Sequence, residues 1–344
     1  MKTDTLIIGQ GITGSLIAFM LHLRGIPFLV MDPGELSTSS RIAAGMFSPV
    51  SGKRKTIQPL VPEQISFAVG IYQSIEELLH VNILHLQNIY QVHDSIAEQN
   101  ELKGKLENGG LGKYILTNPV PLPNIKQAFG AVEISDSGWV DCPLWINSFS
   151  QWLTGKQWLL NEVFLYQDLQ IGDEGMEYHG IECKHIVFCE GFQPRKNPFF
   201  PEENIIPCKG DMLTIEYDQP ATGRIIKRNG TYLVATGKNL FKAGATYQWH
   251  NDNPHPEEAG RKSIEDKLDA LLENEYKIIN HQSAIRPTTQ NRQVIAKRHH
   301  DHAGMFMLNG LGTRGILQGP WFARQIVSLI CNNATTGEDF HSQG

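Results

Sequence analysis

Residues 5–14 of this chain read TLIIGQGITG, and this stretch decides the fold. The apolar run 5–8 ends at a glycine, which is typical of a buried parallel strand. Residues 14–24 predict a helix that stops at Gly25, and residues 26–31 predict a second strand. A strand, tight turn, helix and strand within about thirty residues are typical of a dinucleotide-binding βαβ unit.

The glycines of this turn follow the pattern G-x-G-x-x-G. Gly9 allows the tight turn, Gly11 lets the backbone approach a pyrophosphate, and Gly14 permits close packing of the helix on the strand. Ile12 and Thr13 open the helix, whose free N–H groups and dipole favour an anion. The sequence therefore predicts that these five residues contact the phosphates of a dinucleotide.

An acidic residue, Asp32, ends the second predicted strand. It is expected to accept hydrogen bonds from a ribose 2′-hydroxyl, and its charge disfavours a 2′-phosphate, so NADP is not expected. The alternative is a glycine turn that binds no ligand. This unit alone does not distinguish NAD from FAD.

The composition excludes several classes of protein. The chain has 344 residues, 41% of them hydrophobic, and a formal net charge of −6. A general nucleic-acid-binding domain would normally be basic. No apolar run approaches the roughly 18 residues that span a bilayer, and the N-terminus lacks the pattern of a signal peptide. The chain is therefore expected to be cytoplasmic, without a membrane span.

Cysteine and histidine spacing predicts neither disulfides nor a metal site. None of the five cysteines forms a C-x-x-C pair, which favours a reduced chain without zinc. Residues 299–302 read HHDH, but adjacent histidines in a turn seldom converge on one ion, so a solvated loop is the better interpretation. No metal is expected.

The predicted elements suggest two intermixed domains with an α/β fold. Helices are expected at residues 61–81, 143–153, 256–274 and 320–331. Strands are expected at residues 162–169, 176–179, 185–189 and 305–308, with an alternating strand-rich pattern at 211–245. Residues 1–81, 137–200 and 284–332 are assigned to the nucleotide domain, 82–136 and 201–283 to an inserted α+β domain, and 333–344 to a flexible tail.

Further motifs resemble FAD-dependent enzymes of the D-amino-acid oxidase superfamily. In chain order they are SSRIAAGM (39–46), GWVD (138–141), IVFCEG (186–191), KGDML (209–213), GAT (244–246), SAIRPTT (283–289) and GLGTRGI (310–316). Within the superfamily they are most similar to glycine oxidase and to the oxidase module of the bifunctional tRNA wobble-uridine modification enzyme. The resemblance covers residues 4–330 and implies a Rossmann-like FAD-binding domain with an inserted antiparallel-sheet substrate domain.

The resemblance also implies which residues contact FAD, which is expected to be non-covalent because no cysteine or histidine has the sequence context of a covalent attachment. Backbone contact to the adenine is expected at Val163. Besides the glycine turn and Asp32, the remaining expected contacts are Ser39, Ser40, Arg41, Ala44, Gly45, Met46, Cys189, Glu190, Gly191, Gly312, Arg314, Gly315, Ile316 and Leu317. Cys189 departs from the family, which usually has alanine there.

Three residues are candidates for catalysis. Arg286 matches the arginine that holds the substrate carboxylate in glycine oxidase, where a planar guanidinium fork suits two carboxylate oxygens. Arg314 lies in a loop that lines the flavin in the family, although it can also point outward. Tyr232 matches a substrate-facing tyrosine, but Ala235 stands where the family has proline, so a packed strand aromatic is the alternative.

The chemistry that the resemblance implies is oxidation of the C–N bond of a small amino acid or secondary amine, with hydride transfer to flavin N5. A close alternative is oxidative demodification of a carboxymethylaminomethyl-type tRNA base, which would make a modified tRNA the one expected nucleic-acid partner. An FAD-binding protein without turnover is a third hypothesis, from a different class. The oligomeric state is left open.

Overall fold

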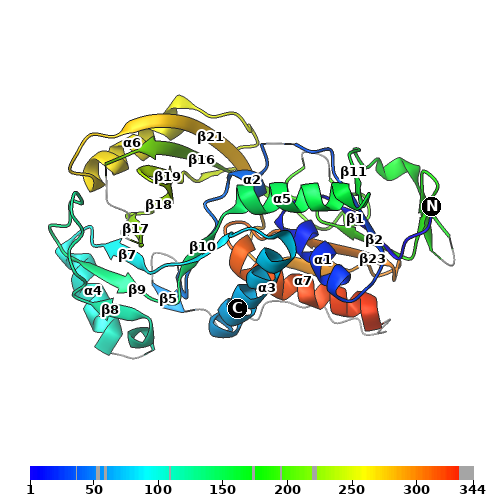
Figure 1. The fold of residues 1–344 in the computed structure, drawn as a ribbon, viewed down its shortest axis with the longest axis horizontal. Coiled ribbons are helices and arrows are strands. Elements are labelled where there is room, and N and C mark those ends of the chain that lie inside the picture. The colour runs from blue at the N-terminus through cyan, green and yellow to red at the C-terminus, as the bar shows by residue number, and fades with distance from the viewer. Residues whose placement is uncertain are drawn as a thin grey trace.

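The structure is a computed structural model that describes residues 1–35, 37–51, 55–57, 60–107, 110–172, 175–193, 196–218 and 223–332. The tail expected at 333–344 lies outside the described residues. Two sheets dominate the molecule, and each lies in a different part of it (Figure 1).

The first sheet has six strands in the order β11-β2-β1-β15-β23-β22. The strands are β11 (Leu159–Leu160), β2 (Phe28–Met31), β1 (Thr5–Ile8), β15 (His185–Phe188), β23 (Met305–Asn309) and β22 (Ile295–Arg298). All neighbouring pairs are parallel except β22 with β23. The predicted βαβ unit is therefore confirmed, with β1 in the middle of the sheet.

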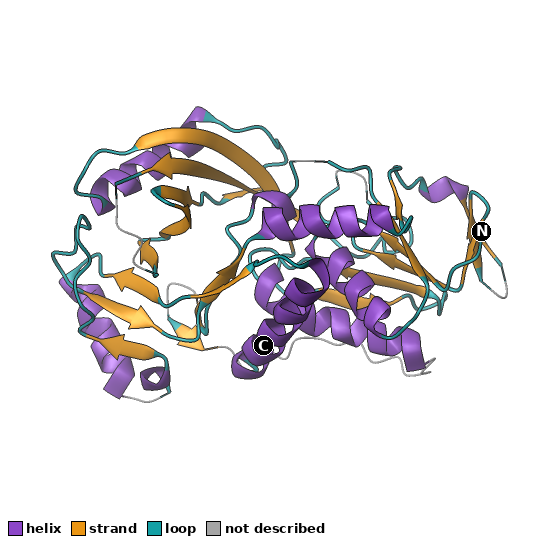
Figure 2. Ribbon diagram, viewed as in Figure 1, coloured by secondary structure: helices purple, strands orange, loops and turns teal. Residues whose placement is uncertain are grey.

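This sheet is covered on both faces, which explains why its strands are continuously apolar. One face, with Ile7 and Val187, packs against α1 (Ile12–Leu23), α3 (Val61–Leu79), α5 (Cys142–Gly155) and α7 (Gly315–Asn332). Figure 2 shows these helices grouped together. The other face, with Leu6 and Phe188, packs against the small sheet formed by β12 (Leu169–Ile171), β13 (Met176–Tyr178) and β14 (Ile181–Cys183).

The second sheet has nine strands and is antiparallel except where β7 lies beside β17. Its strands are β7 (Ile89–Val92), β8 (Ile115–Thr117), β9 (Ala131–Ile134), β16 (Ile206–Glu216), β17 (Ile225–Arg228), β18 (Thr231–Gly237), β19 (Leu240–Gly244), β20 (Gln248–Trp249) and β21 (Lys277–Thr288). The outer face packs against α6 (Glu258–Leu271), and the inner face packs against Ile42 and Ala44 of the loop that resembles the family's flavin loop.

Shorter elements connect the two sheets or flank them. They are α2 (Ser39–Ile42), β3 (Met46–Phe47), β4 (Val50–Ser51), β5 (Thr56–Ile57), β6 (Leu84–Leu86), α4 (Ile96–Glu107), η1 (Leu111–Lys113), β10 (Gly138–Val140) and η2 (Tyr166–Asp168). Strands of the six-stranded sheet come from both ends and the middle of the chain, and the domain bounds remain a prediction. Within the described residues, no helix is long and apolar enough to cross a bilayer.

The strand predicted at 162–169 is wrong. After β11 the chain leaves the sheet, because Phe164 turns inward and stacks on Tyr178 with a centroid distance of 4.5 Å. The hydroxyl of Tyr178 accepts the N–H of Leu165 at 3.1 Å, and η2 follows. The prediction failed because the apolar side chains of this segment resemble those of a buried strand. In the structure they pack against the small sheet, and the backbone of residues 162–168 does not pair in a strand.

The last helix begins at Gly315, five residues before the predicted start at Pro320, which lies inside the helix. Proline has no N–H, so the carbonyl four residues earlier loses its helical partner. That carbonyl belongs to Ile316, and it accepts the buried Tyr72 hydroxyl at 2.8 Å. A residue from α3 therefore satisfies the group that the internal proline leaves free.

Candidate active site

The glycine turn brings three backbone segments into close contact. Gly9 has a φ of +102°, and a Cβ there would collide with the carbonyl of Cys189. A Cβ on Gly14 would collide with the carbonyl of Gly9. Gly11 is the N-cap of α1, and Thr13, in its first turn, hydrogen bonds the Cys189 thiol. The turn therefore places the N-terminus of α1 against the ends of β1 and β15.

Asp32 lies directly after β2, beside this turn. One carboxylate oxygen accepts the N–H of Gln10 at 2.7 Å, and the other accepts the N–H of Gly34 at 2.7 Å. These bonds fix the carboxylate at the carboxyl edge of the sheet, and each oxygen keeps a further lone pair for a ligand hydroxyl.

A second helix N-terminus lies beside the first. The helix α7 begins at Gly315, where an added Cβ would stand 3.6 Å from the Ile12 side chain of α1, and a Cβ on Gly319 would stand only 2.9 Å from Leu16. Ile316 and Leu317 are buried behind Gly315 in the first turn of α7. Two positive helix ends side by side favour a ligand with negative groups.

The loop 39–46 covers this point from another direction. The hydroxyl of Ser40 accepts the N–H of Ile12 at 3.1 Å, and Arg41 donates to the Gln10 side chain at 3.2 Å. Gly45 has a φ of +70°, and a Cβ there would collide with the carbonyl of Val140. Ser39 begins α2, Ala44 is buried, and Met46 pairs with Trp139 in β10.

The segment after β15, residues 189–191, lies beside the glycine turn. We call the glycine turn 9–14, the loop 39–46, the segment 189–191 and the start of α7 together the cradle. Burial raises the pKa of the Cys189 thiol to about 12, so this cysteine is neutral and not reactive. Burial also raises the pKa of Glu190, although hydrogen bonds from Tyr166 at 2.5 Å and Asn197 at 2.9 Å oppose that shift. Gly191 follows with a φ of +63°.

The predicted cofactor residues are thus mostly brought together. The site has backbone packed so closely that only glycine fits, two helix N-termini and an acidic residue held by hydrogen bonds. These features fit a dinucleotide. Val163 follows β11 and is 62% exposed, so any contact from it would come through its backbone. Gly312, with a φ of +54°, donates its N–H to the carbonyl of Pro287 at 2.8 Å and joins the last loop to β21.

Arg286 lies on the inner face of the nine-stranded sheet. Its Nη1 donates to the carbonyl of Thr246 at 3.1 Å, and its guanidinium stacks 4.6 Å from the centre of the Tyr247 ring. A Cβ on Gly210 of the adjacent strand would overlap the guanidinium. Glycine at this position lets the arginine lie flat on β16.

Tyr232 shares this face with Arg286. It is 8% exposed, and burial raises its pKa well above the ordinary value, while the charge of Arg286 acts in the opposite direction. The phenol is therefore neutral at physiological pH. Tyr232 belongs to a buried cluster with Met212, Ala284 and Ala44, so it joins the nine-stranded sheet to the loop 39–46.

Arg314 contacts the backbone of a neighbouring connection. Its guanidinium donates to the backbone carbonyl of Arg292, in the connection between β21 and β22. Burial lowers the pKa of Arg314, and the charge of Arg292 adds to that shift. Its side chain therefore supports this connection, and the backbone of the same loop leads into α7.

The histidine cluster has a structural explanation. Nδ1 of His299 accepts the N–H groups of Asp301 and His302, each at 3.0 Å, and His300 pairs with Asp301 at 2.8 Å. Ligand atoms of His299, His300 and Asp301 lie within 4.8 Å of one another, but the Nδ1 of His299 already caps the turn. The absence of a metal remains a prediction.

Sequence reasoning gave no role to three residues that surround Arg286, namely Gly210, Thr246 and Tyr247. The motifs that contain Gly210 and Thr246 were quoted for their resemblance alone. A glycine inside a long buried strand signals close approach of another group, and that signal was present at Gly210.

Comparison with known proteins identifies the family. Residues 4–329 match the model of the DAO family, described as FAD dependent oxidoreductase. A curated relative, the tRNA 5-methylaminomethyl-2-thiouridine biosynthesis bifunctional protein MnmC of Marinobacter nauticus, is 22% identical over 94% of this chain. The chain spans only 55% of that relative's length.

Solved structures share the whole fold. Glycine oxidase from Bacillus cereus aligns with a TM-score of 0.83 at 20% identity, covering 96% of both chains. Iminodiacetate oxidase from Chelativorans sp. BNC1 aligns with a TM-score of 0.77 at 17% identity, covering 95% of both. The predicted fold class and the predicted cofactor, FAD, are both confirmed. With the glycine cradle, the two helix ends and a family match over nearly its full length, the chain belongs to the DAO family of FAD-dependent oxidoreductases.

Proposed function

We propose that this enzyme oxidises the C–N bond of a small amino acid or secondary amine that carries a carboxylate. The observation that carries the proposal is that the Arg286 guanidinium is positioned but has no carboxylate partner among the described residues. Its guanidinium is partly exposed on the inner face, and it contacts a backbone carbonyl, an aromatic ring and the thiol of Cys208. No carboxylate of the described residues forms an ion pair with it, so most of its five N–H donors are left for a substrate carboxylate.

Bound FAD would supply the acceptor for a hydride from the carbon next to the amine nitrogen. We assign its phosphates to the glycine turn 9–14, its ribose to Asp32 and its flavin end to the loop 39–46 and the start of α7, all without a covalent bond. The protein's part is to fix the substrate by its carboxylate and to exclude water with the buried face around Tyr232. We nominate no general base, because an amine that binds deprotonated needs none.

The test uses the FAD-loaded protein without oxygen, mixed with glycine, sarcosine, proline and D-amino acids in turn. At least one should bleach the flavin absorbance. Arg286→Ala should weaken the apparent affinity for that substrate by about a hundredfold, because hydrogen bonds to a charged group are lost. Arg292→Ala, which removes a neighbouring exposed arginine stacked 5.5 Å over Trp249, is the matched control and should bind it normally.

Two outcomes contradict the proposal. Unchanged affinity in Arg286→Ala would remove the carboxylate role. A flavin that no amine bleaches would favour the alternative of an FAD-binding protein without turnover.

A second candidate function, demodification of a carboxymethylaminomethyl-type tRNA base, has one supporting observation. Tyr247 and Trp249 are 53% and 41% exposed beside Arg286, and such aromatic and guanidinium surfaces can stack nucleobases. In that case Trp249→Ala should slow flavin bleaching by tRNA with this modification and leave bleaching by sarcosine unchanged. Equal effects on both would contradict it.

A further inference from the structure

Strand β16 carries different chemistry on its two faces. Successive side chains of a strand point to opposite sides. Gly210 and Met212 therefore lie on the inner face with Arg286, while Lys209 and Asp211 point to the outer face beneath α6. Both Lys209 and Asp211 are 0% exposed. Buried charges of this kind are costly unless they are paired and hydrogen bonded, so their partners indicate what they hold in place.

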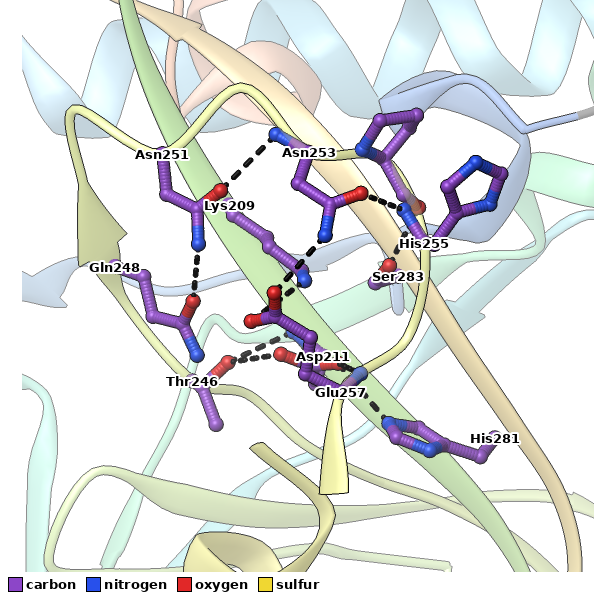
Figure 3. A network of polar contacts seen from close by, with 11 residues as sticks. Lys209, Asp211, Thr246, Gln248, Asn251, Asn253, His255, Glu257, His281 and Ser283 are labelled. Atoms are coloured by element: carbon purple, nitrogen blue, oxygen red, sulfur yellow. Dashed lines mark hydrogen bonds and ion pairs between the residues drawn. The ribbon is translucent and has the colours of Figure 1, made fainter. Parts of the chain in front are cut away.

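The carboxylate of Asp211 has three partners (Figure 3). It contacts Nε2 of His281 at 3.0 Å, accepts the hydroxyl of Thr246 at 3.0 Å and accepts the N–H of Glu257 at 3.3 Å. Glu257 is the N-cap of α6, and a Cβ on Gly260 in the first turn would overlap the carboxylate. Asp211 therefore lies against the positive end of a helix, which stabilises its charge.

The nearby ammonium of Lys209 is paired separately. Its Nζ lies 3.0 Å from one carboxylate oxygen of Glu257, and the other oxygen accepts the side-chain N–H of Asn253 at 2.9 Å. These contacts fix the far end of the segment 246–257 to β16. They leave Asp211 free to act on the near end of that segment.

At the near end, Thr246 is held to Asp211 by three hydrogen bonds. The Asp211 N–H donates to the Thr246 hydroxyl oxygen at 2.8 Å, that hydroxyl donates to the carboxylate, and the Thr246 N–H donates to the Asp211 carbonyl at 3.2 Å. Thr246 is 6% exposed. Both its side chain and its backbone are therefore fixed.

The carbonyl of Thr246 takes no part in these three hydrogen bonds. It accepts a hydrogen bond from Nη1 of Arg286 instead. The next residue, Tyr247, supplies the ring on which the same guanidinium stacks. Two consecutive residues thus set the position of Arg286 from two directions. Whatever fixes Thr246 fixes both contacts.

We propose that Asp211 is a positioning residue for Arg286, and that it acts through the hydroxyl of Thr246. A carboxylate on the outer face of β16 in this way orients the guanidinium on the inner face. The part of this inference that concerns substrate binding rests on the proposed function. The part that concerns the position of Arg286 does not.

The test compares two variants of Thr246 in the FAD-loaded protein, one that keeps the size of the side chain and one that keeps its hydroxyl. Thr246→Val removes the hydroxyl, and Thr246→Ser keeps it. Asp211→Asn is a third variant, which keeps the shape of the side chain and removes its charge. Thermal melting of each first establishes that it is folded, so that the Thr246 pair remains decisive if Asp211→Asn does not fold.

The first measurement does not depend on substrate. It is the rate at which phenylglyoxal, an arginine-specific dicarbonyl, modifies Arg286, followed by peptide mass spectrometry. Thr246→Val should raise this rate several-fold because the guanidinium is freed, and Thr246→Ser should behave as the wild type. An unchanged rate in folded Thr246→Val overturns the proposal.

The second measurement is the dissociation constant of acetate, read from its perturbation of the flavin spectrum. Thr246→Val should weaken acetate binding about tenfold, and Thr246→Ser should restore it. If Arg286→Ala binds acetate as tightly as the wild type does, the carboxylate role in the proposed function fails. The labelling rate still decides whether Asp211 and Thr246 position Arg286.

Discussion

The cofactor cradle and the surroundings of Arg286 are built by different means. In the cradle, backbone atoms of Gly9, Gly14 and Gly45 approach other backbone atoms more closely than any Cβ would allow. Around Arg286, side chains from β16, the segment 246–257 and β21 contact one another across both faces of a strand. The first region depends on the absence of side chains, and the second depends on their hydrogen bonds.

This difference predicts how each region responds to substitution. A Cβ added to the cradle cannot be accommodated, because backbone does not move aside. A change near Arg286 meets the flexible end of a side chain, which can shift at a smaller cost. Damage to the cradle should therefore remove the cofactor, whereas damage around Arg286 should leave the cofactor and change the affinity for carboxylates.

The largest effect is expected for Gly14→Ala. Its Cβ would overlap the Gly9 carbonyl, which should weaken FAD retention at least a hundredfold, on the order of 3 kcal/mol. Flavin absorbance after dialysis measures this. Gly70→Ala, in the middle of α3 with nothing within 4 Å of the added Cβ, is the control and should retain FAD. Equal retention by both variants would break the comparison.

A smaller effect is expected for Gly210→Ala. The added methyl would displace the Arg286 guanidinium, so acetate binding should weaken about thirtyfold, roughly 2 kcal/mol, while FAD is retained. Acetate titration and flavin absorbance on the same sample separate the two outcomes. Loss of FAD here would mean that the two regions are not independent.

Tyr72→Phe should destabilise the first turn of α7 without adding any atom to the glycine turn 9–14. It leaves the Ile316 carbonyl, already without a helical partner because of Pro320, unsatisfied in a buried position. We expect a loss of about 1.5 kcal/mol in the free energy of unfolding, measured by urea denaturation. No loss would show that another group satisfies this carbonyl.

The smallest effect concerns Glu190, whose pKa is raised by burial above the ordinary value of 4.5. Ionising this carboxyl costs more in the folded than in the unfolded state. The wild type therefore loses stability as the pH rises from below 4.5 to above the raised pKa. At pH 7 the free energy of unfolding of Glu190→Gln should exceed that of the wild type by about 1 kcal/mol or less, and this difference should close near pH 4. Urea denaturation at several pH values measures it. A difference that widens on acidification has the wrong sign for this explanation.

The cradle could be predicted from sequence because its signals are local. The glycine spacing, the apolar strand and Asp32 lie within one short segment, and the structure brings them together as expected. Local signals also misled: residues 162–169 are apolar enough for a strand but pack through Phe164. The helix α4 was missed because Leu102 is its only buried residue, so it has no apolar stripe.

The surroundings of Arg286 could not be predicted, because strand register decides them. Cys208 lies opposite Arg286, and Asp211 lies opposite Ser283. A shift of one residue would place Asp211 on the inner face. Nothing within the individual strands specifies this register, so the contact of Thr246 with both Asp211 and Arg286 emerges only from the assembled sheet.

The alternation along β16 also bears on how such an enzyme can acquire new substrates. Cys208 and Met212 point to the inner face that also carries Arg286, whereas Lys209 and Asp211 belong to the buried scaffold beneath α6. Substitutions at these two inner-face positions can therefore change the surface around Arg286 while the scaffold beneath α6 is inherited unchanged. A directed-evolution library confined to Cys208 and Met212 should yield a far larger share of folded, FAD-retaining variants than one confined to Lys209 and Asp211.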